Sequence, residues 1–292
     1  MDGVLIIDKP KNCTSHDVVF KIRKALGTKK VGHAGTLDPM ATGVLPILVG
    51  KGTKIAKYLI EHDKVYEATI KLGEKTDTAD GEGKCIEKKS VSVSCFEEIN
   101  VINALENVKG KQKQIPPMYS AIKVNGKKLY EYAREGIEIK PEARDIEIYN
   151  ISLIEIDKEN QNIKFNVKCS KGTYIRVLCE QIAENLGTVG YMSDLRRIEV
   201  ENFKISQSVT LKQIEENKDN KCFLGKTVIG IEKIFENKGV IELNEKDLQL
   251  FLNGVLLKKD LLDNNYRVYD QNKRFIGLGI VRKNLLKRDI IL

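Results

Sequence analysis

Apolar and polar residues alternate one by one along residues 65–72, and the same alternation recurs along residues 163–169. Side chains on a β-strand point in turn to its two faces, so each stretch is expected to be a strand with one buried face. Residues 3–7 form a short continuous apolar run, which predicts a strand that is buried on both faces. Several strands of one or more sheets are therefore expected.

Helical spacing marks the segments between these strands. Residues 15–26 carry apolar side chains every four positions, with Thr14 or Ser15 available as a cap and Gly27 available to end the helix. A short helix is expected near residues 53–60, and a longer one through residues 178–186. Helices that alternate with strands in this way indicate a mixed architecture.

A further helix is expected over residues 94–105. Ser94 and Glu97 have the spacing of a capping box, in which each side chain bonds to the other's backbone. Phe96, Ile99, Ile102 and Leu105 would form its buried face.

The pattern changes beyond about residue 206. Residues 212–221 are rich in Lys, Glu, Asn and Asp, so residues 206–237 are interpreted as a linker or surface segment. Short strand-like pieces separated by Gly and Asn-Asn turns follow, at residues 266–269, 274–280 and 290–292. This pattern predicts a small C-terminal β-barrel.

Charge is spread unevenly over the 292 residues, which carry a net charge of +8. Residues 1–60 hold ten Lys or Arg against four Asp and no Glu. Such a local excess fits a polyanionic partner such as nucleic acid, although a basic surface also serves general solubility. With 41% hydrophobic and 31% charged residues, the chain has the composition of a globular protein.

The six cysteines form no Cys-x-x-Cys pair and the chain has three histidines, so no structural zinc site is expected. The apolar start is too short for a secretory signal, and no apolar run reaches membrane-spanning length. We therefore expect a cytoplasmic protein with reduced thiols.

The segment from Gly32 to Pro46 is the strongest candidate for chemistry. Its three glycines permit backbone angles closed to other residues, and Pro39 disfavours the helical region for Asp38. A carboxylate held on such a turn among apolar neighbours can be aimed and partly desolvated, which suits a nucleophile or a base. A plain Asp-Pro turn is the alternative interpretation.

The full string, Gly-His-Ala-Gly-Thr-Leu-Asp-Pro-x-Ala-Thr-Gly-x-Leu-Pro, resembles the catalytic motif of the TruB family of tRNA pseudouridine synthases. Further blocks are similar to the family in the same order, at residues 3–10, 64–81, 114–126 and 170–176. A weaker similarity at residues 252–254 and 275–279 points to a PUA domain at the C-terminal end.

The resemblance implies an α+β fold in which a mixed, largely antiparallel sheet surrounds Asp38 in a central cleft. The pseudouridine synthase catalytic domain would span residues 1–237, with an RNA-gripping insertion at about 110–135. A small PUA-like β-barrel that binds RNA would span residues 238–292.

The resemblance also implies the site. Asp38 would be the nucleophile, Arg176 its ion-pair partner, and Tyr66 the residue that stacks on the flipped uracil and moves a proton. His33 would fill the gap left by the everted base. Tyr174 could buttress the site or simply pack. The other expected substrate-binding residues are Lys9, Gly35 and Thr36. Asp77 and Asp80 are expected to cap a turn, because this chemistry needs no metal or cofactor.

The function implied is isomerisation of uridine 55 in the T loop of tRNA, by a monomer without an obligatory protein partner. Three alternatives stay open: an aspartyl phosphohydrolase, a non-catalytic RNA-binding assembly protein, and a related RNA-guided pseudouridine synthase. The phosphohydrolase would need a second acid two positions after Asp38, where Met40 stands. Whether Asp38 attacks the uracil ring or the ribose is not decided by sequence.

Overall fold

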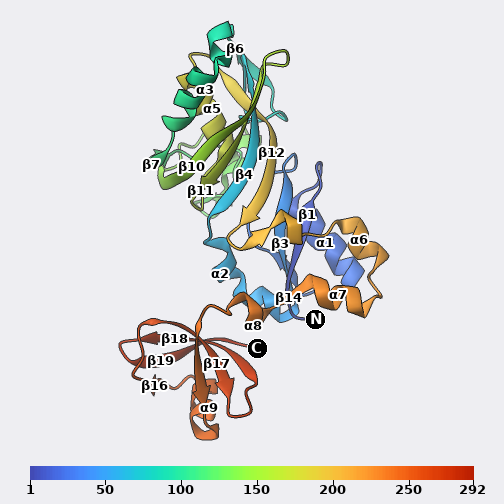
Figure 1. The fold of residues 1–292 in the computed structure, drawn as a ribbon, viewed down its shortest axis with the longest axis vertical. Coiled ribbons are helices and arrows are strands. Elements are labelled where there is room, and N and C mark those ends of the chain that lie inside the picture. Colours follow the sequence, from blue (N-terminus) through green and yellow to red (C-terminus); the bar gives the residue numbers. More distant parts are fainter.

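The computed structural model describes residues 1–292 and contains one large and one smaller sheet (Figure 1). The large sheet has ten strands, and every neighbouring pair is antiparallel except β12 with β3. In order across the sheet its strands are β14 (Val228–Gly230), β1 (Gly3–Lys9), β3 (Thr42–Val49), β12 (Gly190–Val200), β4 (Lys64–Leu72), β11 (Asn162–Cys169), β10 (Arg144–Asp157) and β7 (Gly110–Gln114), with β2 (Val31–His33) beside β3 and β13 (Phe203–Lys204) beside β12.

Five helices pack on one face of this sheet and enclose the main hydrophobic core. They are α1 (Ser15–Leu26), α3 (Glu98–Glu106), α5 (Ile175–Asn185), α6 (Leu211–Glu216) and α7 (Lys221–Thr227). Thr14 caps α1 and Gly27 ends it in the left-handed conformation, which confirms both boundaries expected from sequence. No helix of the chain has the length and apolar character needed to cross a membrane.

The other face is covered at the β1–β3 end. Val4 and Ile6 of β1 point to this second face, while Leu5 and Ile7 point into the main core. The covering elements are the 3-10 helix η1 (Gly50–Ile55), α2 (Ala56–Ile60) and α8 (Ile231–Ile234). The strand predicted at residues 3–7 is therefore confirmed, including its burial on both faces.

The helix expected over residues 94–105 begins later than the sequence pattern indicated. Ser92, not Ser94, caps a short 3-10 helix, η2 (Val93–Phe96), and α3 starts at Glu98. Its buried residues are Val101, Ala104 and Leu105, while Ile99 is 62% exposed. Of the four apolar residues expected to form the buried face, Phe96 and Leu105 are buried, whereas Ile99 and Ile102 are exposed.

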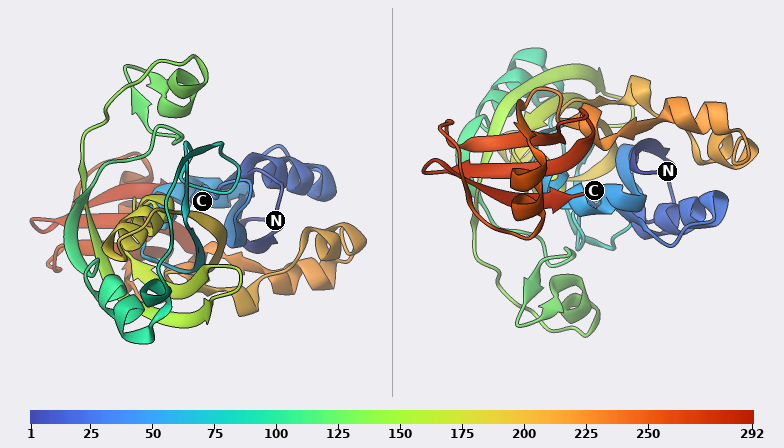
Figure 2. Two further views of the ribbon diagram at one scale, coloured as in Figure 1. Left: turned by 90° about the horizontal axis from the view of Figure 1, so that it is seen from above. Right: turned by 90° about the horizontal axis from the view of Figure 1, so that it is seen from below.

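Residues 115–143 leave the sheet and form a separate protrusion, visible in both views of Figure 2. It contains the hairpin β8 (Lys123–Val124) and β9 (Lys127–Lys128), followed by α4 (Leu129–Arg134). The insertion expected at about residues 110–135 therefore starts later, because residues 110–114 form β7 at the sheet edge. A smaller hairpin, β5 (Glu74–Thr76) and β6 (Cys85–Lys88), extends from the end of β4.

The polar stretch interpreted as a linker is packed against the large sheet. The 3-10 helix η3 (Ile205–Gln207) opens it, α6, α7 and α8 follow, and β14 pairs with β1. Ile214, Leu224 and Ile231 are each at most 5% exposed. One buried side chain per short helix is enough to attach a segment whose composition is otherwise polar.

The C-terminal part forms a second, five-stranded sheet that curls on itself (Figures 1 and 2). Its order is β15 (Gly239–Leu243), β17 (Asn264–Asp270), β18 (Phe275–Arg282), β19 (Leu285–Ile291) and β16 (Leu257–Lys258). Helix α9 (Glu245–Leu252) packs against it through Phe251, which is completely buried. The α+β class with a small C-terminal β structure is confirmed.

The two sheets share a hydrophobic cluster. Leu278 and Ile290 of the C-terminal sheet pack in the same cluster as Leu48 of β3 and Phe235 after α8. Beside it, the carboxylate of Asp289, 8% exposed, accepts hydrogen bonds from the Lys57 ammonium and the Tyr58 hydroxyl of α2. The C-terminal sheet is thereby docked on α2, the helix that leads into β4.

We predict that Asp289→Asn weakens this docking, because an amide keeps the shape but not the charge that Lys57 requires. The apparent melting temperature should fall by roughly 2–6 °C. Asp260→Asn, at an exposed position of the same sheet domain, is the matched control. Equal melting curves for the two variants would contradict a stabilising role for Asp289.

Candidate active site

Asp38 lies in an irregular loop between β2 and β3. Inside the loop, Ala41 N donates to Asp38 O at 3.1 Å and closes a turn with Pro39 at its second position. Gly35 and Gly43 have φ angles of +94° and +102°, which side-chain-bearing residues rarely adopt. A Cβ on Gly43 would also lie 2.1 Å from the Arg197 carbonyl oxygen. Glycine is therefore required where the loop enters β3.

Lys9, at the end of β1, holds the loop from below. The residue is 0% exposed, and its ammonium donates to the carbonyl oxygens of Pro39 at 3.1 Å, Ala41 at 2.7 Å and Pro10 at 2.9 Å. Lys9 therefore supports the loop that carries Asp38, and all three of its N–H groups are used for this support.

Two further buried side chains bind the loop backbone. The Ser15 hydroxyl accepts from Leu37 N at 2.9 Å and donates to Leu37 O at 3.2 Å. Arg197 of β12 donates to the carbonyl oxygens of Val44 at 2.7 Å and Gly35 at 3.1 Å, and approaches that of Thr36 at 3.5 Å. The loop is held on both sides of Asp38.

Arg176, in the first turn of α5, lies against the Asp38 carboxylate. Its Nε is 3.2 Å from Asp38 Oδ2, and its Nη1 is 3.3 Å from Asp80 Oδ2. The remaining donors reach the carbonyl oxygens of Thr78 at 2.9 Å and Tyr119 at 2.7 Å. The pairing of Asp38 with Arg176 expected from the resemblance is present in the structure.

The Asp38 side chain is 36% exposed, so it remains accessible to a ligand. Burial is the largest influence on its pKa and raises it above the ordinary value, and the charge of Asp80 adds to this rise. The Arg176 and Lys9 cations act in the opposite direction. Taken together, these influences give Asp38 a raised pKa while its carboxylate stays paired with Arg176.

Tyr66 projects from β4 toward the same region and is 8% exposed. Burial raises the pKa of its hydroxyl, and the nearby Asp38 charge raises it further. The guanidinium of Arg197, the cross-strand partner of Tyr66, lowers this pKa. The ring is therefore a core residue and a member of the site at the same time.

The other expected binding residues surround the loop. His33 of β2 is partly buried; burial lowers its pKa, and its Nδ1 is buried without a hydrogen-bond partner. Thr36 is exposed. Tyr174 precedes α5, where its backbone exchanges hydrogen bonds with the Gln114 amide at 2.7 and 3.1 Å. The Gln114 side chain thereby holds the backbone at the start of the helix that carries Arg176.

Two residues of the site have roles that sequence reasoning missed. Asp80 does cap its turn, by accepting from Thr78 Oγ1 at 2.6 Å and Glu82 N at 3.1 Å, but it also pairs with Arg176. Arg197 is 1% exposed. The sequence feature that could have revealed it is the pair of adjacent arginines within a strand. Side chains alternate between the two faces of a strand, so one of two neighbouring arginines must point inward.

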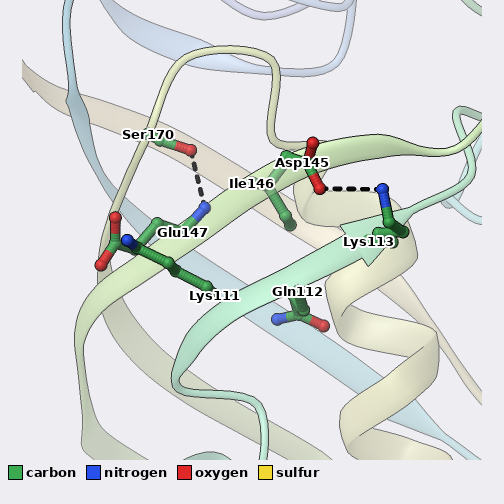
Figure 3. Close-up of a pocket in the computed structure, with 7 residues that line it drawn as sticks. All are labelled: Lys111, Gln112, Lys113, Asp145, Ile146, Glu147 and Ser170. Atoms are coloured by element: carbon green, nitrogen blue, oxygen red, sulfur yellow. Dashed lines mark hydrogen bonds and ion pairs between the residues drawn. The ribbon is translucent and has the colours of Figure 1, made fainter.

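A separate hollow of about 470 Å³ lies at the sheet edge, lined by residues of β7 and β10 (Figure 3). Two of its charged residues, Lys113 and Asp145, form an ion pair at 3.0 Å. None of the candidate site residues lines it. No cluster of His, Cys, Asp or Glu in the chain has the arrangement of a metal site.

Several known proteins that are similar to this chain are described as pseudouridine synthases. The family description "TruB family pseudouridylate synthase (N terminal domain)" matches residues 23–175, and "tRNA pseudouridylate synthase B C-terminal domain" matches residues 176–236. The tRNA pseudouridine synthase B of Clostridium acetobutylicum is 45% identical over 96% of this chain and 95% of its own length. That of Clostridium novyi is 44% identical over the whole of both chains. A solved Cbf5–Nop10–Gar1 complex contains a chain of the same fold, with a TM-score of 0.72 and 24% identity over 99% of this chain and 83% of that one.

We predict that Asp38→Asn raises the melting temperature at neutral pH. The pKa of Asp38 is higher in the folded protein than its ordinary 3.8, so its ionisation costs stability as pH rises through this window. An amide does not ionise, and its advantage should shrink as pH falls toward about 4. Thermal melts between about pH 4 and 8 measure this difference. A lower melting temperature for the variant at neutral pH would contradict the prediction.

Proposed function

The chain belongs to the TruB family of pseudouridylate synthases, and from this premise we propose that it converts uridine 55 in the T loop of tRNA to pseudouridine. The relatives named tRNA pseudouridine synthase B match almost the full chain and support tRNA as the substrate. The observation that carries the proposal is the partly exposed Asp38 carboxylate. It pairs with Arg176 and lies in a loop whose backbone carbonyls accept hydrogen bonds from Lys9 and Arg197.

Asp38 acts as the nucleophile in this proposal. The reaction breaks the bond between the ribose and nitrogen 1 of the base, turns the base, and rejoins it through carbon 5. The carboxylate can attack either the uracil ring or the anomeric carbon of the ribose, and both routes require its ionised form. The Arg176 cation favours that form, while burial increases the basicity of the carboxylate.

The target base must leave the helical stack to reach Asp38. Tyr66 offers an aromatic face for the flipped uracil, and such stacking contributes about 1–3 kcal/mol per base. His33, Gly35 and Thr36 lie along the loop beside Asp38, where they can contact the RNA around the everted nucleotide. The hydroxyl of Tyr66 is also suited to take part in the proton transfer that ends the reaction.

Two basic surfaces are proposed to hold the RNA. One is formed by exposed lysines on and just after α1, namely Lys21, Lys24, Lys29 and Lys30. The other is the protrusion, where Lys127 lies 4.8 Å from the Tyr132 ring and Lys128 lies 5.2 Å from the Tyr130 ring. Cations and aromatic rings of this kind bind phosphates and unstacked bases.

The alternatives have weaker support. A non-catalytic RNA-binding protein has no need for the Asp38–Arg176–Asp80 arrangement. An RNA-guided enzyme shares the fold, but the relatives above 40% identity are named for action on tRNA. We therefore propose a monomer that works without an obligatory protein partner.

The experiment that tests the function is incubation with an unmodified tRNA transcript, followed by mapping of pseudouridine position by position. Wild-type protein should modify position 55 alone. Asp38→Asn should form no product, because it removes the nucleophile, while its tRNA affinity stays within about tenfold of wild type. Product in the purified variant, or modification elsewhere in the wild-type reaction, would refute the proposal.

The α1 surface generates a further prediction. Replacing Lys29 and Lys30 together by Gln should weaken tRNA binding and reduce the log–log slope of affinity against salt by about 0.7–0.9 for each phosphate that is no longer neutralised. Lys158→Gln, at the exposed turn between β10 and β11, is the control with one charge removed elsewhere. A slope unchanged from wild type would place the RNA away from α1.

A further inference from the structure

Arg197 is a buried cation that forms no ion pair. Its neighbour Arg196 pairs with Asp8 at 2.8 Å and Arg176 pairs with Asp38 and Asp80, whereas no carboxylate lies within 4 Å of Arg197. The hydrogen bonds of its guanidinium all go to backbone carbonyl oxygens, namely those of Val44, Thr36 and Gly35. A buried charge is costly unless it is paired, so this arrangement requires an explanation.

The strand register places Arg197 and Tyr66 side by side. Arg197 of β12 is the direct cross-strand partner of Tyr66 in β4, and on its other side it pairs with Gly43 of β3. Directly opposed residues of neighbouring strands project to the same face. The guanidinium therefore lies between the Tyr66 hydroxyl and the two ends of the loop that carries Asp38.

The proposed reaction would create a negative charge next to Arg197. After the base has been rejoined through carbon 5, the proton on that carbon must leave while its bonding pair returns to the ring. A phenol can accept this proton only if it has first released its own. A tyrosinate at position 66 would turn the unpaired Arg197 into one half of a buried ion pair.

We propose that Arg197 is a positioning residue for catalysis, which holds the Tyr66 hydroxyl and stabilises its ionised form for removal of the carbon 5 proton. This inference rests on the proposed function. It also explains why a cation is buried at this position without a carboxylate partner.

Other charged and titratable groups face the same space. Asp38, from the loop, opposes ionisation of Tyr66, and the Cys169 thiol of β11 has a pKa of about 12 and is neutral at neutral pH. Lys9 of β1, Lys64 of β4 and His33 of β2 lie within the electrostatic range of Arg197. Arg197 is the cation among them that lies directly opposite Tyr66 on the neighbouring strand.

The test is the pH profile of the single-turnover rate at saturating tRNA, from neutral to alkaline pH. Arg197→Gln keeps hydrogen-bond donors but removes the charge, and Arg197→Lys keeps the charge. The Gln variant should move the rising limb of the profile to higher pH, and its rate at neutral pH should fall about tenfold for every pH unit that the limb moves. The Lys variant should retain the wild-type limb, even if its rate is lower at every pH.

Arg196→Gln is the matched control, because it removes a charge from the next position of the same strand, and its profile should keep the wild-type limb. A merely structural role for Arg197 predicts that the Gln and Lys variants lose rate equally at every pH, and that result would overturn the inference. Disappearance of the displaced limb when Arg197→Gln is combined with Tyr66→Phe would support it.

If Arg197→Gln does not fold, the ultraviolet absorbance of tyrosinate decides instead. Subtracting the pH titration of Tyr66→Phe from that of wild type isolates the absorbance change of the Tyr66 phenol. The same subtraction is made with two proteins that also carry Arg197→Lys, and Tyr66 should then ionise at a pH close to its wild-type value. A titration of Tyr66 that moves up to the range of an isolated buried phenol in that background would refute the role of the charge. Absence of pseudouridine with wild-type protein would refute the proposed function rather than this inference.

Discussion

The backbone of the loop around Asp38 must find hydrogen-bond partners outside regular secondary structure, and the rest of the site follows from this requirement. Lys9, Ser15 and Arg197 provide these partners from three different elements. An unpaired buried carbonyl or N–H costs about 1–3 kcal/mol, so a loop with this many bound groups has few alternative conformations of similar energy. Asp38 is therefore aimed before any substrate arrives, which reduces the reorganisation that catalysis requires.

Arg176 connects this loop to two other parts of the chain. Its guanidinium contacts Asp38, the turn at Thr78 and Asp80, and the carbonyl of Tyr119 at the base of the protrusion. The segment proposed to grip RNA thus shares a hydrogen-bonded residue with the proposed nucleophile. Movement at the base of the protrusion must alter a contact of Arg176, so RNA binding and the electrostatics of Asp38 are physically linked.

The sequence predicted those features that depend on local pattern. The alternation in β4 and the two caps of α1 are determined by side chains close to one another along the chain, and both are confirmed. The start of α3 was misplaced because Ser94 and Glu97 have the spacing of a capping box, whereas in the structure Ser92 caps the separate η2 and Glu97 precedes α3 without a side-chain cap. The linker interpretation failed for a similar reason, since composition cannot show where one isoleucine meets a core. Within the site, the resemblance pointed to Asp38, Arg176 and Lys9, but not to Ser15 or Arg197 as side chains that hold the loop. Arg197 was hard to recognise because charged side chains are mostly exposed, and only the fold shows that backbone carbonyls surround it.

The docking of the C-terminal sheet extends the same rigidity to the whole molecule. β1 and β3 use one set of side chains for the main core and the alternate set for the cluster that includes Leu278 and Ile290. The strands that flank the Asp38 loop are therefore fixed from both faces, one covered by helices and the other partly by the C-terminal part. A tRNA that contacts both the protrusion and the C-terminal sheet would meet surfaces whose spacing to Asp38 is set by packed side chains. Selection of one uridine within a folded RNA can then rest on distance and shape, which is how proteins recognise structured RNA.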